Sequence, residues 1–242
     1  MILEVKHVKK SFGTKKVLND INFTLNAGEC LGIVGLSGCG KSTLAKIIAK
    51  LIPCDGGEIF LCGEDILRTN GNAFYKNMQM IFQNPEDSFN PRRILGQSIA
   101  EPIKNYRINA AVEDLLEQVG LTKEYKKRYP REVSGGECQR AAIARAISVS
   151  PKLLICDEAT SALDVTIQAQ IVKLLRRFCT EKNIACLFIT HDLALLPELA
   201  DKVIVLHEGA IVEEGTPEKI IKEPKSPFTR QLMASNFFKE WI

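Results

Sequence analysis

A short glycine-rich stretch near the N-terminus, from Gly35 to Thr43, constrains this chain more than any other feature. It reads Gly-Leu-Ser-Gly-Cys-Gly-Lys-Ser-Thr and fits the phosphate-binding pattern Gly-x4-Gly-Lys-Ser/Thr. In such a loop, small residues let backbone N–H groups close around phosphate oxygens at the start of a helix. The residues that we expect to line this phosphate loop are Gly35, Ser37, Gly38, Cys39, Gly40, Lys41, Ser42 and Thr43.

Two side chains of the loop add chemistry to the backbone. Lys41 supplies a point charge for the β- and γ-phosphates of a nucleotide, and the Ser42 hydroxyl is a hard oxygen ligand that suits Mg2+. The context also fits, because a buried-strand pattern at 31–34 precedes the loop and a helical pattern at 43–49 follows it. A purely structural glycine turn is the alternative, but it would not explain Lys-Ser-Thr directly after the last glycine.

The composition is that of a globular protein with a substantial core. Of the 242 residues, 45% are hydrophobic and 25% are charged, and the formal net charge is only +3. This balance gives no case for a nucleic-acid-binding protein. No apolar run approaches the roughly 18–20 residues of a membrane span, and the N-terminus lacks the layout of a signal peptide. We therefore expect a cytoplasmic protein, unless partners hold it at a membrane.

The order of the apolar runs predicts an α/β fold. Early strands, divided by turns, predict an antiparallel flank on a nucleotide-binding core. We expect the strands of this flank at 2–9, 17–25 and 58–61. Later apolar runs do not alternate with polar residues and are separated by helical patterns, which predicts a parallel sheet. These runs lie at 153–156, 185–189 and 202–206.

Helical periodicity separates the two parts of this core, with breakers at Gly120 and Pro130. The predicted helices lie at 94–103, 109–119 and 136–149. We expect one domain over 1–242, made of a core with its β flank at about 1–85 and 141–215, an inserted helical subdomain at about 86–140, and a short tail at 216–242. The apolar tail residues expected to dock on the body are Phe228, Leu232, Phe237, Phe238 and Trp241.

Two acidic residues, Asp157 and Glu158, follow the apolar run 153–156. They fall at the carboxyl end of a predicted central strand, where ligands of open α/β sheets bind. Asp157 is then placed to hold Mg2+, directly or through water, and Glu158 to orient or deprotonate a water that attacks the γ-phosphate. A solvated turn is the alternative, which the phosphate loop in the same chain disfavours.

Further motifs allow a resemblance to be stated, because they follow in the order typical of one family. Gln83 matches its glutamine loop, and His191, after a predicted strand, matches its switch histidine. Its signature motif and D-loop are matched by Ser134-Gly135-Gly136-Glu137 and Ser161-Ala162-Leu163-Asp164. Over nearly its whole length, the chain resembles the nucleotide-binding domain of an ABC ATPase, which implies a RecA-like P-loop NTPase core that binds ATP and Mg2+.

The resemblance also implies roles for single residues. Ser134 and Gly136 would close over the γ-phosphate bound by an opposite subunit, so that ATP joins two such domains. Phe12 would stack on adenine, and Asp164 would belong to the nucleotide site. Gln83 would touch Mg2+ or water and report occupancy to the helical insertion. The implied catalytic residues are Glu158, His191, Gln83 and Lys41, and the implied metal ligands are Ser42, Gln83 and Asp157.

The signature departs from the family's usual Leu-Ser-Gly-Gly-Gln, since this chain has Val133 at its start and Glu137 at its end. A carboxylate that faces a bound triphosphate would weaken the sandwich by like-charge repulsion. We therefore expect Glu137→Gln to leave turnover of the assembled protein unchanged or faster.

Two local segments, 83–94 and 226–235, are similar to those of the oligopeptide and nickel importer subfamily, and the chain resembles the shorter of its two ATPases. This implies an ATPase subunit that energises uptake of peptides, nickel or metal–chelator complexes. Its partners would be a second, paralogous ATPase subunit, two membrane permeases and an extracytoplasmic solute-binding protein, at the cytoplasmic face of the membrane. The sequence does not choose between these cargoes, or between a homodimer and a heterodimer.

Two other functions are weighed against an importer subunit. A soluble ABC ATPase of DNA repair or translation usually adds a coiled-coil or zinc insertion or a second cassette, and none is visible in this sequence. A regulatory ATP-binding module with low turnover would not need the catalytic set, and Lys41, Asp157, Glu158 and His191 are all retained.

Overall fold

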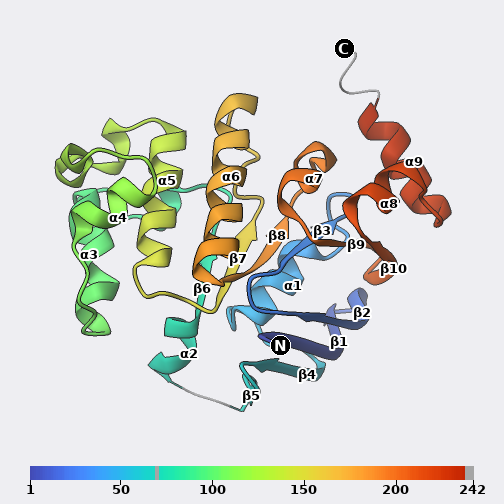
Figure 1. The fold of residues 1–242 in the computed structure, drawn as a ribbon. Coiled ribbons are helices and arrows are strands. Elements are labelled where there is room, and N and C mark those ends of the chain that lie inside the picture. Colours follow the sequence, from blue (N-terminus) through green and yellow to red (C-terminus); the bar gives the residue numbers. More distant parts are fainter. Residues whose placement is uncertain (69–70, 238–242) are drawn as a thin grey trace.

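Two β-sheets organise the structure, a computed structural model that describes residues 1–68 and 71–237 (Figure 1). The first sheet is antiparallel with the order β2-β1-β4-β5, and it confirms the predicted flank. Its strands are β1 (Leu3–Phe12), β2 (Lys15–Leu25), β4 (Gly56–Leu61) and β5 (Glu64–Asp65).

The second sheet has the order β10-β9-β3-β8-β7-β6 and is parallel except for β10, which pairs antiparallel with β9. Its strands are β3 (Cys30–Val34), β6 (Met78–Ile81), β7 (Leu153–Asp157), β8 (Ala185–Ile189), β9 (Lys202–His207) and β10 (Ala210–Gly215). Every residue of β3, β7 and β8 is buried. Burial on both faces explains why these runs do not alternate, and the predicted parallel core is confirmed.

Alternate residues of the central strands enter two different cores. In β7, Leu153 and Ile155 pack with α1 (Lys41–Ile48) and the antiparallel flank. Leu154 and Cys156 point to the opposite face, where α6 (Val165–Lys182) and the inserted helices cover the sheet. Helix α1 therefore lies between the two sheets, at the carboxyl edge of β3, which is where a phosphate loop has to be.

The segment 86–140 contains η1 (Glu86–Ser88), α3 (Leu95–Asn105), α4 (Val112–Gln118), η2 (Lys123–Lys127), η3 (Pro130–Glu132) and the first part of α5 (Gly135–Ile147). The three longer helices fall where helical periodicity predicts them. The short helix α2 (Asn72–Asn77) was not predicted. None of the helices in the part of the chain that the structure describes is long and apolar enough to cross a membrane.

The tail docks on the body through two helices, α8 (Pro217–Lys222) and α9 (Pro227–Phe237), after the short η4 (Leu193–Leu195) and α7 (Leu196–Leu199). Leu232 is buried in a third apolar cluster, and the Phe228 ring stacks on His207 with 3.7 Å between ring centroids. The expected docking is confirmed for these two residues. Phe238, Trp241 and the side chain of Phe237 lie outside what the structure describes.

Candidate nucleotide site

The phosphate loop joins β3 to α1 through positions that require glycine. Gly40 is the N-cap of α1 and has a φ of 113°. A Cβ on Gly35 would lie 2.2 Å from the Leu206 carbonyl oxygen, so no side chain fits there. Ser37 and Gly38 are exposed, Ser42 and Thr43 are half-buried, and Cys39 is buried. The loop thus presents its outer backbone to solvent while its base is fixed by the sheet.

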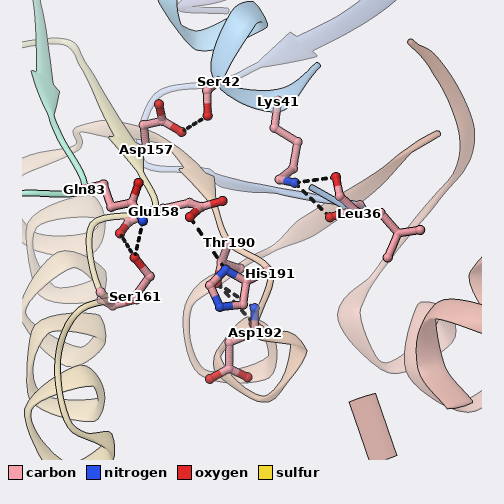
Figure 2. A network of polar contacts seen from close by, with 12 residues as sticks. Leu36, Lys41, Ser42, Gln83, Asp157, Glu158, Ser161, Thr190, His191 and Asp192 are labelled. Atoms are coloured by element: carbon pink, nitrogen blue, oxygen red, sulfur yellow. Dashed lines mark hydrogen bonds and ion pairs between the residues drawn. The ribbon is translucent and has the colours of Figure 1, made fainter. Parts of the chain in front are cut away.

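Lys41 is the buried charge of this loop, with 4% of its surface exposed. Its Nζ donates hydrogen bonds to the carbonyl oxygens of Gly35 at 2.8 Å and Leu36 at 3.0 Å (Figure 2). These bonds hold the ammonium under the curve of the loop. A phosphate in the loop would meet both the lysine charge and the first backbone amides of α1.

Asp157, at the end of β7, lies opposite the loop. The Ser42 hydroxyl donates a hydrogen bond of 2.9 Å to Asp157 Oδ1 (Figure 2). Burial raises the pKa of this carboxyl, and the bond from Ser42 opposes that rise. Two hard oxygen ligands therefore already converge beside the phosphate loop, which is a donor set that fits Mg2+.

Glu158 has backbone geometry that few non-glycine residues adopt, with a φ of 51°. Its N–H donates to the Ile189 carbonyl at 3.0 Å, which fixes this turn to β8. Its Oε2 lies 3.7 Å from Nδ1 of His191, which stands two positions after the last residue of β8 (Figure 2). The loop that carries His191 is closed by a bond from the Asp192 N–H to the buried Thr190 hydroxyl at 3.0 Å.

Gln83 lies on the side of Glu158 opposite His191, and Ser161 links Gln83 to Glu158. Its Nε2 donates to Ser161 Oγ at 3.2 Å, and Ser161 Oγ donates to the Glu158 carbonyl at 3.0 Å (Figure 2). The glutamine is thus joined to the segment after β7. Sequence reasoning places Ser161 in the D-loop but misses this bridge, because nothing local in the sequence signals a bond between residues this far apart.

Phe12 lies at the end of the β1–β2 hairpin, which packs against the phosphate loop. A Cβ on Gly40 would lie 2.7 Å from the Val17 carbonyl oxygen, and Val17 belongs to β2. The Phe12 ring is 52% exposed, and Lys10 Nζ lies 5.3 Å from its centroid. An exposed aromatic ring on the hairpin that contacts the loop is a suitable surface for a nucleobase.

The signature residues form a second group, at the start of α5 and α6. Ser134 is the N-cap of α5, and a Cβ on Gly136 would lie 2.7 Å from Ile167 of α6. Asp164 caps α6 by accepting a bond of 3.0 Å from the Ile167 N–H. The structure therefore brings Lys41, Ser42, Asp157, Glu158, His191 and Gln83 together. In the part of the chain that the structure describes, no hydrogen bond or ion pair joins Ser134, Gly136 or Asp164 to these six side chains.

Comparisons with known proteins agree on one family. The family model described as ABC transporter matches residues 18–161. Oligopeptide transport ATP-binding protein OppF of Haemophilus influenzae is 41% identical over 97% of this chain and 78% of its own length. OppF of Bacillus subtilis is also 41% identical, over 97% of this chain and 82% of its own length.

Two solved structures have the same fold at 24% identity. An ATP-binding subunit of an ABC transporter has a TM-score of 0.82, covering 98% of this chain and 100% of its own. A dimeric ATP-binding cassette in a post-hydrolysis state, bound to ADP and Pi, has a TM-score of 0.78, covering 89% and 99%. The family match and the identity to OppF show that this chain belongs to the ABC transporter family, as an ATPase domain.

Proposed function

We propose that this chain is the ATP-hydrolysing subunit of an importer for oligopeptides. The observation that carries the proposal is the meeting of Lys41, Ser42, Asp157 and Glu158 at one edge of the parallel sheet, in a chain whose relatives are named oligopeptide transport ATP-binding proteins. These names favour oligopeptides over nickel or metal chelates as cargo. They also disfavour a role in DNA repair or translation.

Mg2+ would be held by the Ser42 hydroxyl and the Asp157 carboxylate, which lie 2.9 Å apart. When bound, it would neutralise charge on the β- and γ-phosphates of ATP. Lys41 adds its charge from beneath the loop. For its side chain to reach Mg2+, Gln83 would first have to break its hydrogen bond to Ser161.

Glu158 is the proposed general base. Water attacks the γ-phosphorus, its proton passes to the Glu158 carboxylate, and the bond to the β–γ bridging oxygen breaks to release ADP. The backbone turn at Glu158 orients its side chain. His191, whose Nδ1 lies 3.7 Å from Glu158 Oε2, would hold the glutamate and contact the γ-phosphate. Therefore Lys41, Ser42 and Asp157 would bind the phosphates and Mg2+, and Glu158 would accept the proton.

A second ATPase subunit would complete the site. Ser134 and Gly136 lie at the start of α5, and α6 stands between α5 and the helix α1 that follows the phosphate loop (Figure 1). Their helix N-terminus suits an anion, so we propose that it closes over ATP bound by a homologous or paralogous subunit, with Asp164 beside it. Two membrane permeases would hold the pair at the cytoplasmic face of the membrane, and a solute-binding protein would deliver the peptide.

Substitution of the proposed base tests the hydrolytic function. Glu158→Gln keeps the size of the side chain but removes the proton acceptor, so phosphate release should fall at least about 100-fold. ATP should then stay bound and stabilise a dimer. Glu181→Gln is the matched control, because Glu181 is an exposed residue of α6. Unaltered steady-state hydrolysis in Glu158→Gln would contradict the assignment.

Co-purification tests the transport role. A tag on this chain should recover membrane permeases together with a second ATPase subunit. Recovery of ribosomes or DNA in place of permeases would favour the repair or translation function.

A further inference from the structure

The carboxylate of Glu137 has a defined position that its place in the signature motif does not reveal. Its Oε2 accepts a bond of 2.8 Å from the Ser134 N–H, and Ser134 Oγ accepts one of 3.4 Å from the Glu137 N–H. Together these bonds form a capping box at the start of α5. The other oxygen, Oε1, accepts a hydrogen bond from the Tyr125 hydroxyl.

Tyr125 comes from η2, a segment that the inserted helices hold in place. Lys126 forms an ion pair with Glu113 of α4, and the Leu95 N–H of α3 donates to the Arg128 carbonyl at 2.8 Å. These contacts fix the position of the backbone from which the Tyr125 side chain extends. Its bond is the first cause of the lowered pKa of Glu137, so this carboxylate stays ionised around neutral pH.

The residues around the start of α5 differ in how far they are exposed to solvent. Ser134 and Gly135 are exposed, whereas Glu137 and Tyr125 are half-buried. A carboxylate with no second donor would be drawn to the exposed amides of the same helix N-terminus, where an anion is stabilised. It would then compete with any phosphate that approached Ser134.

We propose that Tyr125 is a positioning residue that holds the Glu137 carboxylate away from the γ-phosphate. The inference rests on the proposed function, in which Ser134 and Gly136 close over ATP bound by a second subunit. Tyr125 donates its hydroxyl to Oε1 and keeps the charge on the η2 side of α5. The hydroxyl thereby lets a signature motif with a carboxylate accept a triphosphate.

A double-mutant cycle of Tyr125→Phe and Glu137→Gln tests this inference. Glutamine preserves the capping box and removes the charge. ATPase activity of the complete transporter, purified through a tag on this chain, is measured against ATP concentration. In the wild-type background, Tyr125→Phe should raise KM for ATP by about three- to fivefold, the size expected for a partly exposed charge interaction, with little change in kcat. In the Glu137→Gln background, the same substitution should leave KM unchanged.

Two further readouts separate charge from structure. The KM difference should shrink as salt is added, because salt screens the repulsion. The loss of melting temperature caused by Tyr125→Phe should be similar in both backgrounds. An equal rise of KM in both backgrounds, or no rise in either, would overturn the inference. Failure of the proposed function has a different signature, which is hydrolysis that survives Glu158→Gln.

Discussion

At the residue scale, Asp157 is a carboxyl group whose burial opposes its ionised form. Its pKa is raised in the folded state, so the folded state binds a proton more tightly than the unfolded state does. Protonation therefore stabilises the fold, and this contribution is lost as pH rises through the raised pKa. At neutral pH the buried carboxylate lowers the stability of the ligand-free domain, and a bound cation would compensate for it.

Asp157→Asn should remove this penalty and keep the bond from Ser42, because the amide oxygen still accepts it. Without nucleotide at about pH 7, the variant should melt a few degrees higher than the wild type, since about 1 kcal/mol corresponds to about 2–4 °C in a domain of this size. The difference should shrink as pH falls through the raised pKa of Asp157, and it should vanish below the ordinary pKa of aspartate. Thermal unfolding at several pH values measures it.

The same variant should lose the stabilisation that the proposed binding of Mg2+ and ATP would give the wild type. Asp114→Asn is the matched control for the ligand response, because Asp114 is an exposed residue of α4 and the same substitution there removes a carboxylate outside the candidate nucleotide site. A melting temperature of Asp157→Asn below that of the wild type at neutral pH would contradict the account of the buried charge.

Glu137 shows where sequence reasoning about single residues ends. The spacing Ser-x-x-Glu from Ser134 to Glu137 is a readable capping-box pattern, and reading the glutamate only as a repulsive charge overlooks it. Its bond to Tyr125 has no local signal, because it depends on how η2 packs against α3 and α4. By contrast, the meeting of Ser42 and Asp157 follows from two strand ends on one sheet edge.

At the element scale, the long apolar runs were predictable and the short helices were not. The strands β3, β7 and β8 are buried on both faces, which leaves an unbroken run in the sequence. The tail helices α8 and α9 begin with Pro217 and Pro227, residues that read as breakers although proline is favoured in the first turn of a helix. Helix α2 has only six residues, too few to show a period.

Helix α9 should stabilise the core through its buried side chains, and Leu232 is one of them. Leu232 is 5% exposed and packs in the cluster that contains Val34 and Val205 of the central sheet. Leu232→Ala should therefore lower the free energy of unfolding by about 2–4 kcal/mol, through lost burial and the cavity that remains. Chemical denaturation measures the change.

Val165→Ala is the matched control, because Val165 is 80% exposed, and it should change stability by less than about 0.5 kcal/mol. Below its unfolding transition, Leu232→Ala should still hydrolyse ATP, since Leu232 packs in a cluster that contains none of the residues around Glu158. Equal stability of the two variants would show that α9 does not contribute to the core.

At the scale of the whole molecule, an open groove separates the inserted helices from the core. It is lined by Leu51 after α1, Tyr75 of α2, Phe82 beside Gln83, and Pro102 of α3, with Arg145 of α5 at one side. Leu51, Tyr75 and Phe82 are 51%, 42% and 38% exposed. Apolar side chains gathered in an open groove are suited to contact a partner, and a partner in contact with Phe82 would lie next to Gln83 of the candidate nucleotide site.

A cytoplasmic segment of a permease is the occupant that the proposed function requires. Leu51→Glu places a charge in the groove, so permease recovered with the tagged chain should fall about tenfold, the loss expected for one central apolar contact. ATP binding by the isolated chain should persist, because Leu51 lies outside the phosphate loop. Leu67→Glu, at an exposed leucine beyond β5 and outside the groove, should leave permease recovery unchanged. Equal recovery with both variants would place the permease contact elsewhere, and the coupling to Gln83 would then need another route.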